Sequence, residues 1–224
     1  MKLDSQTLTT FVFLASSIVL CRAQVAVDNR SLTVPQQCAM YMSEESVMKK
    51  LSLNSAQANV YNQALRKYVL MLSSQAKDAD MKTNDVKFAN ACLNALNPSQ
   101  THTLLQIGVP RIGSIALIDP SISTQVGLEP GQVKQIEKIC RDFAKRDEDV
   151  SAMIANAIDE IPEPKPGADR KKYEKKCAEV AAMYEGERQR IAREKAEADK
   201  KALALLSPTQ KAKWLDLAGP VKTK

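Results

Sequence analysis

The sequence repeats one short pattern four times: a leucine, a polar residue, two further residues and a glutamine. The copies are LNSAQ, LNPSQ, LEPGQ and LSPTQ, and their leucines and glutamines are Leu53 and Gln57, Leu96 and Gln100, Leu128 and Gln132, and Leu206 and Gln210. At a helix start, the polar side chain can accept a hydrogen bond from a first-turn amide, and the glutamine can accept one from the cap's own amide. Three copies also place proline at the first helical position, where its missing N–H costs nothing. The pattern therefore predicts four capped helices.

Composition favours the same kind of fold. Only 7 of the 224 residues are glycine, and aromatic residues make up 4% of the chain. Few glycines leave few sites for the positive-φ turns of β-hairpins, and aromatic residues are typical of strands. We expect an all-α protein built from antiparallel helices.

The four helix starts pair into two copies of a longer unit. VMKKLSLNSAQ, which begins at Val47, matches ISTQVGLEPGQ, which begins at Ile122. LNALNPSQTHTLLQI, from Leu93, matches LALLSPTQKAKWLDL, from Leu203. This A-B-A′-B′ order indicates an internal duplication. We interpret residues 24–118 as the first helical unit and residues 119–224 as the second, within one continuous fold.

The second unit contains the pattern of a long helical hairpin. Apolar residues recur three and four positions apart from Val133 to Ile161, with Asp147 as the one polar interruption. Prolines then end the helix, and residues 169–206 carry a narrow apolar seam every seven residues, as in a coiled coil.

Charge supports the pairing of the two hairpin arms. Asp159 and Glu160 lie at the end of the first arm, and Lys171 and Lys172 lie at the start of the second. An antiparallel hairpin brings these groups together, so the basic run has a partner within the chain. We therefore expect no nucleic-acid partner.

The first unit has a less regular pattern. It predicts helices over residues 40–50, 54–76 and 86–96, with a polar loop over residues 78–84. The apolar stretch after Gln100 is broken by Gly108, Pro110 and Gly113, which predicts a kinked, buried helix, and Asp119 then caps the next one. The break leaves two interpretations open: local repacking of a buried helix, or a ligand pocket.

Residues 1–23 have the features of a secretory signal peptide. Lys2 provides the positive start, residues 11–20 are an apolar core, and the predicted cleavage lies between Ala23 and Gln24. The apolar run is about half of the ~20 residues that a membrane-spanning helix needs. We expect export to a periplasm or out of the cell, without stable membrane insertion after cleavage. An uncleaved anchor and a lipoprotein at Cys21 are the alternatives.

Four cysteines follow the predicted cleavage point: Cys38, Cys92, Cys140 and Cys177. In an exported protein, an even number is compatible with two disulfides in one of three connectivities, or with buried free thiols. A straight hairpin separates Cys140 from Cys177 by more than the ~7 Å that a disulfide spans between Cα atoms, so this pair is disfavoured.

The chain lacks the motifs of familiar catalytic and metal sites. Its single histidine, His102, excludes His-based triads and multi-histidine metal sites, and the motifs of nucleophile elbows, phosphate loops and zinc proteases are missing. His102 follows a helix start and is interpreted as a surface residue. Asp147, on an apolar seam, is the one candidate for a carboxylate with a perturbed pKa, and the favoured interpretation is that it reaches Arg or Lys at the hairpin edge or marks a local break in the seam. We predict no catalytic site, cofactor or metal site.

The four motifs resemble those of the LTxxQ family of exported bacterial helical proteins, which includes the Spy- and CpxP-like proteins. LNPSQ and LSPTQ carry the resemblance most closely, and the likeness covers most of residues 43–219. Two departures are that none of these four starts has threonine at the cap and that there are four motifs rather than two. The chain looks similar to a subgroup of exported proteins with a duplicated motif pair.

This resemblance implies a function without catalysis. Members bind unfolded or envelope proteins without ATP on a concave helical surface, or act in the response to envelope stress. Two motif pairs in one chain would let a monomer form the cradle that short members build as dimers. The alternatives are an envelope scaffold without a client and a metal-sensing regulator.

Overall fold

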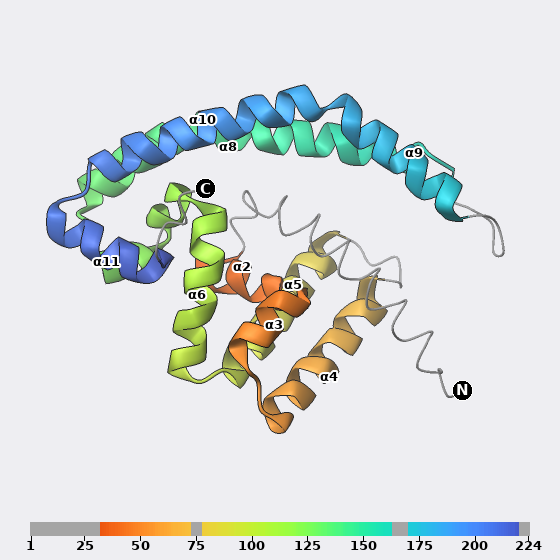
Figure 1. The fold of residues 1–224 in the computed structure, drawn as a ribbon, viewed down its shortest axis with the longest axis horizontal. Coiled ribbons are helices and arrows are strands. Elements are labelled where there is room, and N and C mark those ends of the chain that lie inside the picture. The colour runs from red at the N-terminus through yellow and green to blue at the C-terminus, as the bar shows by residue number, and fades with distance from the viewer. Residues whose placement is uncertain (1–31, 73–77, 163–169, 220–224) are drawn as a thin grey trace.

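A computed structural model describes residues 32–72, 78–162 and 170–219. Within these ranges every regular element is a helix, which confirms the predicted all-α class (Figure 1). The predicted signal peptide and its cleavage point, Ala23 and Gln24, lie outside the described residues. In chain order the elements are α2 (Val34–Met40), η2 (Tyr41–Ser43), α3 (Glu45–Leu51), α4 (Ser55–Leu72), α5 (Asp78–Ala95), α6 (Pro98–Ile112), η3 (Ser114–Ile118), α7 (Pro120–Val126), α8 (Pro130–Asp159), α9 (Arg170–Met183), α10 (Glu185–Ala204) and α11 (Pro208–Ala218).

All four predicted helix starts are confirmed. The helices α4, α6, α8 and α11 each begin one residue after the polar position of a motif. The motif leucines pack into the core, where Leu206 is buried and the other three, Leu53, Leu96 and Leu128, are partly buried against it. Each motif therefore ends one segment in the core and starts a new helix there.

The predicted hairpin forms an arch over the rest of the molecule. Helix α8 runs antiparallel to α9 and α10, and the pair curves with its convex side away from the other helices (Figure 1). Long helices commonly curve in this way around the core they cover. Every apolar seam position predicted on α8 is buried or partly buried, from Val133 through Ile136, Cys140, Phe143, Val150, Ile154 and Ala157.

The second arm of the hairpin is not one continuous helix as predicted. It breaks at Tyr184, whose φ of −98° and ψ of 5° separate α9 from α10. Gly186 follows two residues later, and glycine is among the weakest helix formers. The seam residues Ile191 and Ala198 beyond the break are buried as predicted. The charge pairing predicted for Asp159 and Lys171 concerns side chains outside the described set.

Two predictions for the first unit are wrong. The expected polar loop at residues 78–84 is the beginning of α5, because buried Phe88, Ala89 and Cys92 pack this helix against α2 and α4. The expected helix at residues 40–50 is divided into η2 and α3, since Glu44 is extended with ψ of 128° and begins a new helix. Tertiary packing overrides local propensity at both places.

The kinked helix after Gln100 is α6, which contains Pro110 and ends at Ile112. Gly113 then adopts φ of 83°, a conformation that favours glycine, and the chain continues into η3. Asp119 caps α7 as predicted by accepting from the amides of Ser121 and Ile122. Helix α6 lies at the centre of the body, against α2, α3 and α11.

Buried residues of both predicted units form one contiguous core, which extends from Leu32 to Ala218. Among the described residues, no helix combines the length and apolarity needed to cross a membrane.

Candidate functional site

The motif glutamines meet in pairs, one pair from each predicted copy. Gln57 Nε2 donates to Gln100 Oε1 at 2.7 Å, and Gln100 Nε2 donates back to Gln57 Oε1 at 3.2 Å. Each amide also donates to the end of the helix before its partner: Gln57 to Ala95 O at 2.8 Å and Gln100 to Leu51 O at 3.0 Å. Each Oε1 additionally accepts from the amide of its own cap. The Nε2 and Oε1 atoms of both side chains therefore each have two hydrogen-bond partners.

The second pair repeats this pattern. Gln132 and Gln210 bond in both directions at 3.0 and 2.9 Å. Gln132 also donates to Leu205 O at 3.0 Å, and Gln210 donates to Gly127 O at 2.7 Å. Sequence analysis predicted the caps but not these reciprocal pairs. Each pair ties two helix starts to two helix ends.

A fifth helix start was missed by the sequence analysis. Residues 32–36 spell LTVPQ, and the Thr33 amide donates to Gln36 Oε1 at 2.8 Å at the beginning of α2. This start does have threonine at the cap, and the Leu-polar-x-x-Gln spacing was the signal that could have found it. Gln36 donates to Asn90 Oδ1 at 2.8 Å rather than to another glutamine.

The fifth start is joined to the second unit. The Val34 amide donates to Asp119 Oδ2 at 2.8 Å, while Asp119 Oδ1 caps α7. The same carboxylate therefore fixes the beginnings of α2 and α7. Buried Leu32 and Val34 are held beside η3 as a result.

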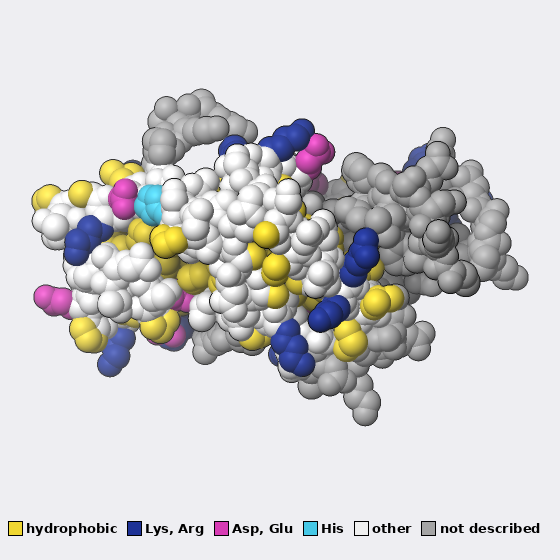
Figure 2. All heavy atoms as spheres, turned by 90° about the horizontal axis from the view of Figure 1, so that it is seen from below, with side chains coloured by type: hydrophobic (Ala, Val, Ile, Leu, Met, Phe, Trp, Pro, Cys, Tyr) yellow, Lys and Arg dark blue, Asp and Glu magenta, His cyan; other side chains and the backbone are white. Residues whose placement is uncertain are grey.

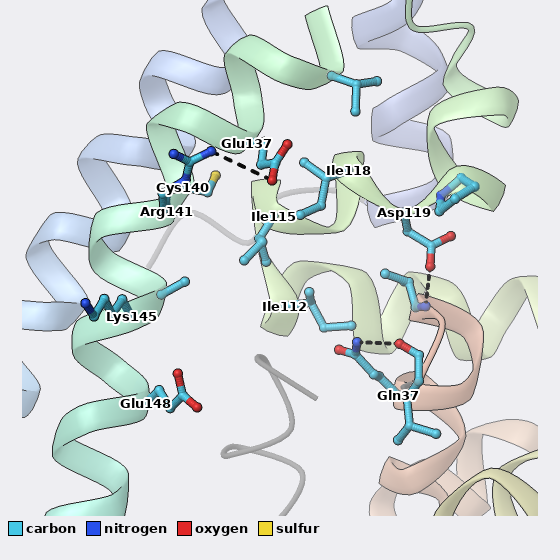
Figure 3. Close-up of a pocket in the computed structure, with 15 residues that line it drawn as sticks. Gln37, Ile112, Ile115, Ile118, Asp119, Glu137, Cys140, Arg141, Lys145 and Glu148 are labelled. Atoms are coloured by element: carbon cyan, nitrogen blue, oxygen red, sulfur yellow. Dashed lines mark hydrogen bonds and ion pairs between the residues drawn. The ribbon is translucent and has the colours of Figure 1, made fainter. Parts of the chain in front are cut away.

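These connections shape a groove between α8 and the helices beneath the arch (Figure 3). Its volume is about 560 Å³, within the range of ligand-binding sites. The first wall comes from residues before α8: Leu32, Val34, Gln37, Ile112, Ile115, Ile118, Asp119 and Pro120. The second wall is one face of α8: Val133, Glu137, Cys140, Arg141, Ala144, Lys145 and Glu148. We refer to this site as the arch groove.

The first wall of the arch groove is mainly apolar, with Gln37 and Asp119 as its polar members. Ile112 ends α6, and Ile115 and Ile118 lie on η3, opposite α8 (Figure 3). Ile112 is buried, whereas Ile115 and Ile118 are only partly buried. These three side chains come from the Gly/Pro-broken stretch for which sequence analysis left both repacking and a pocket open. The stretch does supply one wall of a cavity.

The α8 wall combines a buried edge and a charged edge. Cys140 and Ala144 are buried, whereas Arg141, Lys145 and Glu148 are exposed. Arg141 lies 3.9 Å from Glu137, one turn earlier. This face includes the predicted seam positions Val133 and Cys140, but its charged members lie beside the seam, so the seam identified only part of it.

A polar network fixes the arch to the body behind the groove. Lys195 Nζ donates to Arg111 O at 2.6 Å, and Asp199 Oδ1 accepts from the Ser114 amide at 2.6 Å. A Cβ on Gly113 would lie 2.8 Å from Lys195 Cε, so glycine allows this close approach. Burial lowers the pKa of Lys195, and Asp199 and Asp147 oppose this effect. The hydroxyl of Ser114 also lies 3.6 Å from the sulfur of Cys140.

Burial shifts the pKa values of Asp147 and Cys140. Burial raises the pKa of Asp147, partly offset by Lys195 and Arg188, so the one candidate carboxylate is perturbed although the sequence favoured the other interpretation. Burial likewise raises the pKa of Cys140, which leaves a neutral thiol rather than a thiolate at the groove.

The four cysteines carry free thiols in the structure, so the disulfide alternative is not what the structure contains. Cys38, Cys92 and Cys140 are buried, and Cys177 is partly buried. His102 is partly exposed on α6, with its Nε2 3.0 Å from Gln106 Nε2 and 3.9 Å from Asp216 Oδ1. It lies outside the arch groove, whose lining does not include it.

Comparison with protein-family models, with curated proteins and with solved structures finds no match to this chain. Its functional interpretation therefore rests on its own residues and geometry.

Proposed function

We propose that the protein is an exported binding protein that holds unfolded segments of envelope proteins without ATP. The observation that carries the proposal is the arch groove, which combines three isoleucines on one wall with charged side chains on the other. The apolar wall suits the hydrophobic side chains that an unfolded client exposes, and burying them is favourable by about 25 cal/mol per Å². A volume of about 560 Å³ accommodates a few side chains rather than a folded domain.

The charged edge suits a site that binds many sequences. Glu137 and Glu148 flank Arg141 and Lys145 along α8, so the edge carries two charges of each sign. Such an edge can contact clients of either net charge. It adds little affinity because exposed ion pairs contribute about 0–1 kcal/mol each. Apolar contacts therefore select for unfolded segments, and release remains easy.

The helix-start motifs support the relationship to the LTxxQ family that we propose. Five starts follow the same spacing, and the one at Leu32–Gln36 has the threonine of the family pattern. Both reciprocal glutamine pairs form within one chain. This supports the proposal that one copy of the chain forms a complete cradle. Sedimentation velocity is expected to give a monomer, and a stable dimer with an extensive interface would contradict this part of the proposal.

The proposal is tested by suppression of aggregation without ATP. Reduced α-lactalbumin is allowed to aggregate alone or with increasing amounts of the protein, and light scattering is followed. We expect suppression at near-stoichiometric amounts. The absence of any effect at several-fold excess would contradict client binding and favour a scaffold.

Variants locate the activity in the arch groove. Ile115→Gln with Ile118→Gln is expected to abolish suppression, whereas Leu215→Gln, at an exposed position on α11, is expected to leave it unchanged. Circular dichroism verifies folding. Ala144→Met, which fills the groove from the α8 side, is the second variant and is expected to reduce suppression without adding a polar group. Equal activity of the groove variants and Leu215→Gln would contradict the assignment.

A further inference from the structure

The outer face of α4 has a composition unlike that of an ordinary solvated helix face. It exposes Val60, Leu70 and Met71, with 46%, 70% and 36% of their surface accessible. These are three of the six large hydrophobic side chains that are exposed among the described residues. Arg66 and Lys67 are exposed on the same helix. We refer to these five residues as the α4 outer face.

The α4 outer face has no negative charge. Arg66 and Lys67 are the only charged residues of α4. On neighbouring α5, Asp85 is buried and accepts from the Tyr68 hydroxyl at 2.6 Å, so it faces the interior. Figure 2 shows Lys and Arg side chains beside hydrophobic ones in the region of α4, without Asp or Glu between them.

The core does not require these exposed apolar residues. Tyr61, Leu65 and Tyr68 form the inner face of α4, and this face packs on α5. Val60 and Met71 lie on the other side at helical spacing, together with Lys67. Exposed Gln63 lies between Val60 and Lys67, so the helix has a second, mixed surface of apolar, basic and neutral polar side chains in addition to the face that stabilises the fold.

We propose that the α4 outer face docks on an anionic lipid bilayer surface. Leu70, Met71 and Val60 can enter the boundary between headgroups and acyl chains, while Arg66 and Lys67 approach lipid phosphates. Each cation near an anionic bilayer contributes about 1 kcal/mol of attraction, or about a fivefold change in partitioning. The formal net charge of +6 for the whole chain adds long-range attraction of the same sign.

Charge and composition favour lipid over other partners. In a symmetric contact between two copies, the cations of the α4 outer face would meet like charges. A nucleic acid offers phosphates but no apolar layer for Leu70, and the face exposes no aromatic side chain for stacking on bases. A bilayer surface matches both the cations and the aliphatic side chains.

This surface is separate from the arch groove. Helix α4 lies on the side of the body away from the α8–α10 arch (Figure 1). Docking through α4 would leave the groove open while the protein rests on a membrane. The proposal does not depend on client binding, because vesicle binding is measured without a client and aggregation without lipid.

Vesicle co-sedimentation tests the proposal. The protein lacking only residues 1–23, which retains every described residue, is mixed with phosphatidylcholine vesicles that contain either no anionic lipid or about 30% phosphatidylglycerol. We expect binding to the anionic vesicles only, and its loss at high salt because exposed charges are screened. No binding to anionic vesicles, or equal binding to neutral ones, would overturn the proposal.

Matched variants locate the surface. Arg66→Gln with Lys67→Gln is expected to weaken partitioning about 30-fold, from two contributions of about 1 kcal/mol each. Lys211→Gln with Lys213→Gln removes the same charge from exposed positions on α11. This control pair is expected to change the partitioning onto anionic vesicles by less than about twofold. Equal losses in the two pairs would show a general charge effect and overturn the proposal.

A fluorescence measurement keeps the test independent of the charge variants. An environment-sensitive dye attached through Leu70→Cys, in a protein that also carries Cys177→Ser, is expected to shift to shorter wavelength with anionic vesicles, whereas the same dye at Leu215→Cys in the same background is not. A dimer dispersed by Leu70→Gln would instead assign the α4 outer face to a second copy. Binding of single-stranded DNA that is lost in Arg66→Gln with Lys67→Gln, without vesicle binding, would assign it to nucleic acid.

Discussion

The side-chain amides of Gln132 and Gln210 hydrogen-bond to each other in both directions, although 78 residues separate them in the chain. Each amide also accepts from its own cap amide and donates to the carbonyl of a residue at the end of another helix. Helix termini leave several backbone groups without partners, and these two side chains satisfy four of them at once. The pair therefore links the beginnings of α8 and α11 and also caps each helix.

Removal of one member is expected to destabilise the fold more than removal of a cap alone. Gln210→Ala loses four hydrogen bonds, two with Gln132 and one each with Gly127 and Ser207. At about 0.5–1 kcal/mol for each bond, the free energy of unfolding is expected to fall by about 2–4 kcal/mol in urea titrations. Gln135→Ala, at an exposed position of α8, is the matched control and is expected to change the free energy of unfolding by less than about 0.5 kcal/mol.

A double-mutant cycle isolates the amide pair itself. Gln132→Ala with Gln210→Ala is expected to cost less than the sum of the two single changes, with a coupling of about 1 kcal/mol or more. Strict additivity would show that the two glutamines act only as separate caps.

The contact between α2 and α6 gives a second prediction. A Cβ placed on Gly108 would lie 2.3 Å from Cys38 Sγ and 2.8 Å from Cys38 Cβ. Gly108→Ala is therefore expected to lower the free energy of unfolding by about 1–3 kcal/mol through overpacking, despite the better helix propensity of alanine.

Gly186→Ala provides the contrast, because a Cβ at Gly186 has no atom within 4 Å. This change is expected to raise the stability of the hairpin by up to about 1 kcal/mol. Thermal unfolding followed by circular dichroism measures both variants. A Gly108→Ala protein as stable as the parent would show that α2 and α6 can separate at no cost.

Local chemistry explains what could be predicted from the sequence. A cap depends on residues within four positions, so LNPSQ and LSPTQ were sufficient to place the beginnings of α6 and α11. The seam of α8 likewise follows from the helical period. The start at Thr33 was missed although LTVPQ carries the same local spacing.

Features that depend on tertiary structure could not be predicted in the same way. The partner of Gln57 is Gln100, and its position is known only once α4 and α6 are placed. The α8 wall of the arch groove includes charged Arg141 and Lys145, which local sequence marks only as a solvated face. Helix α5 begins earlier than its apolar pattern because packing around Phe88 extends it.

Thiol labelling gives a third prediction. Burial raises the pKa of both Cys38 and Cys92 to about 12, so neither forms a thiolate near neutral pH in the folded protein. N-ethylmaleimide at pH 8 is expected to modify partly buried Cys177 first and to reach the other two only after unfolding in urea. Peptide mapping by mass spectrometry identifies the sites. Native labelling of Cys38 at the rate of Cys177, or recovery of a disulfide-linked peptide, would contradict the structure.

The carboxylate of Asp147 predicts an unusual pH dependence of stability. Burial raises its pKa above the ordinary 3.8, so the folded state binds a proton at this site more tightly than the unfolded state does. The contribution of Asp147 therefore destabilises the fold as pH rises from about 3.8 through the raised pKa, and it stays constant above that window. Asp147→Asn removes this ionisation. Relative to the parent, the variant is expected to be most stabilised at pH 7, with the difference shrinking towards pH 4 in urea titrations. Asp149→Asn, at an exposed position two residues away, is expected to lack this pattern. A variant that is less stable than the parent at pH 7, by a margin that shrinks as pH falls, would mean that the ionised carboxylate stabilises the fold through Lys195 and Arg188, contrary to the direction given by its burial.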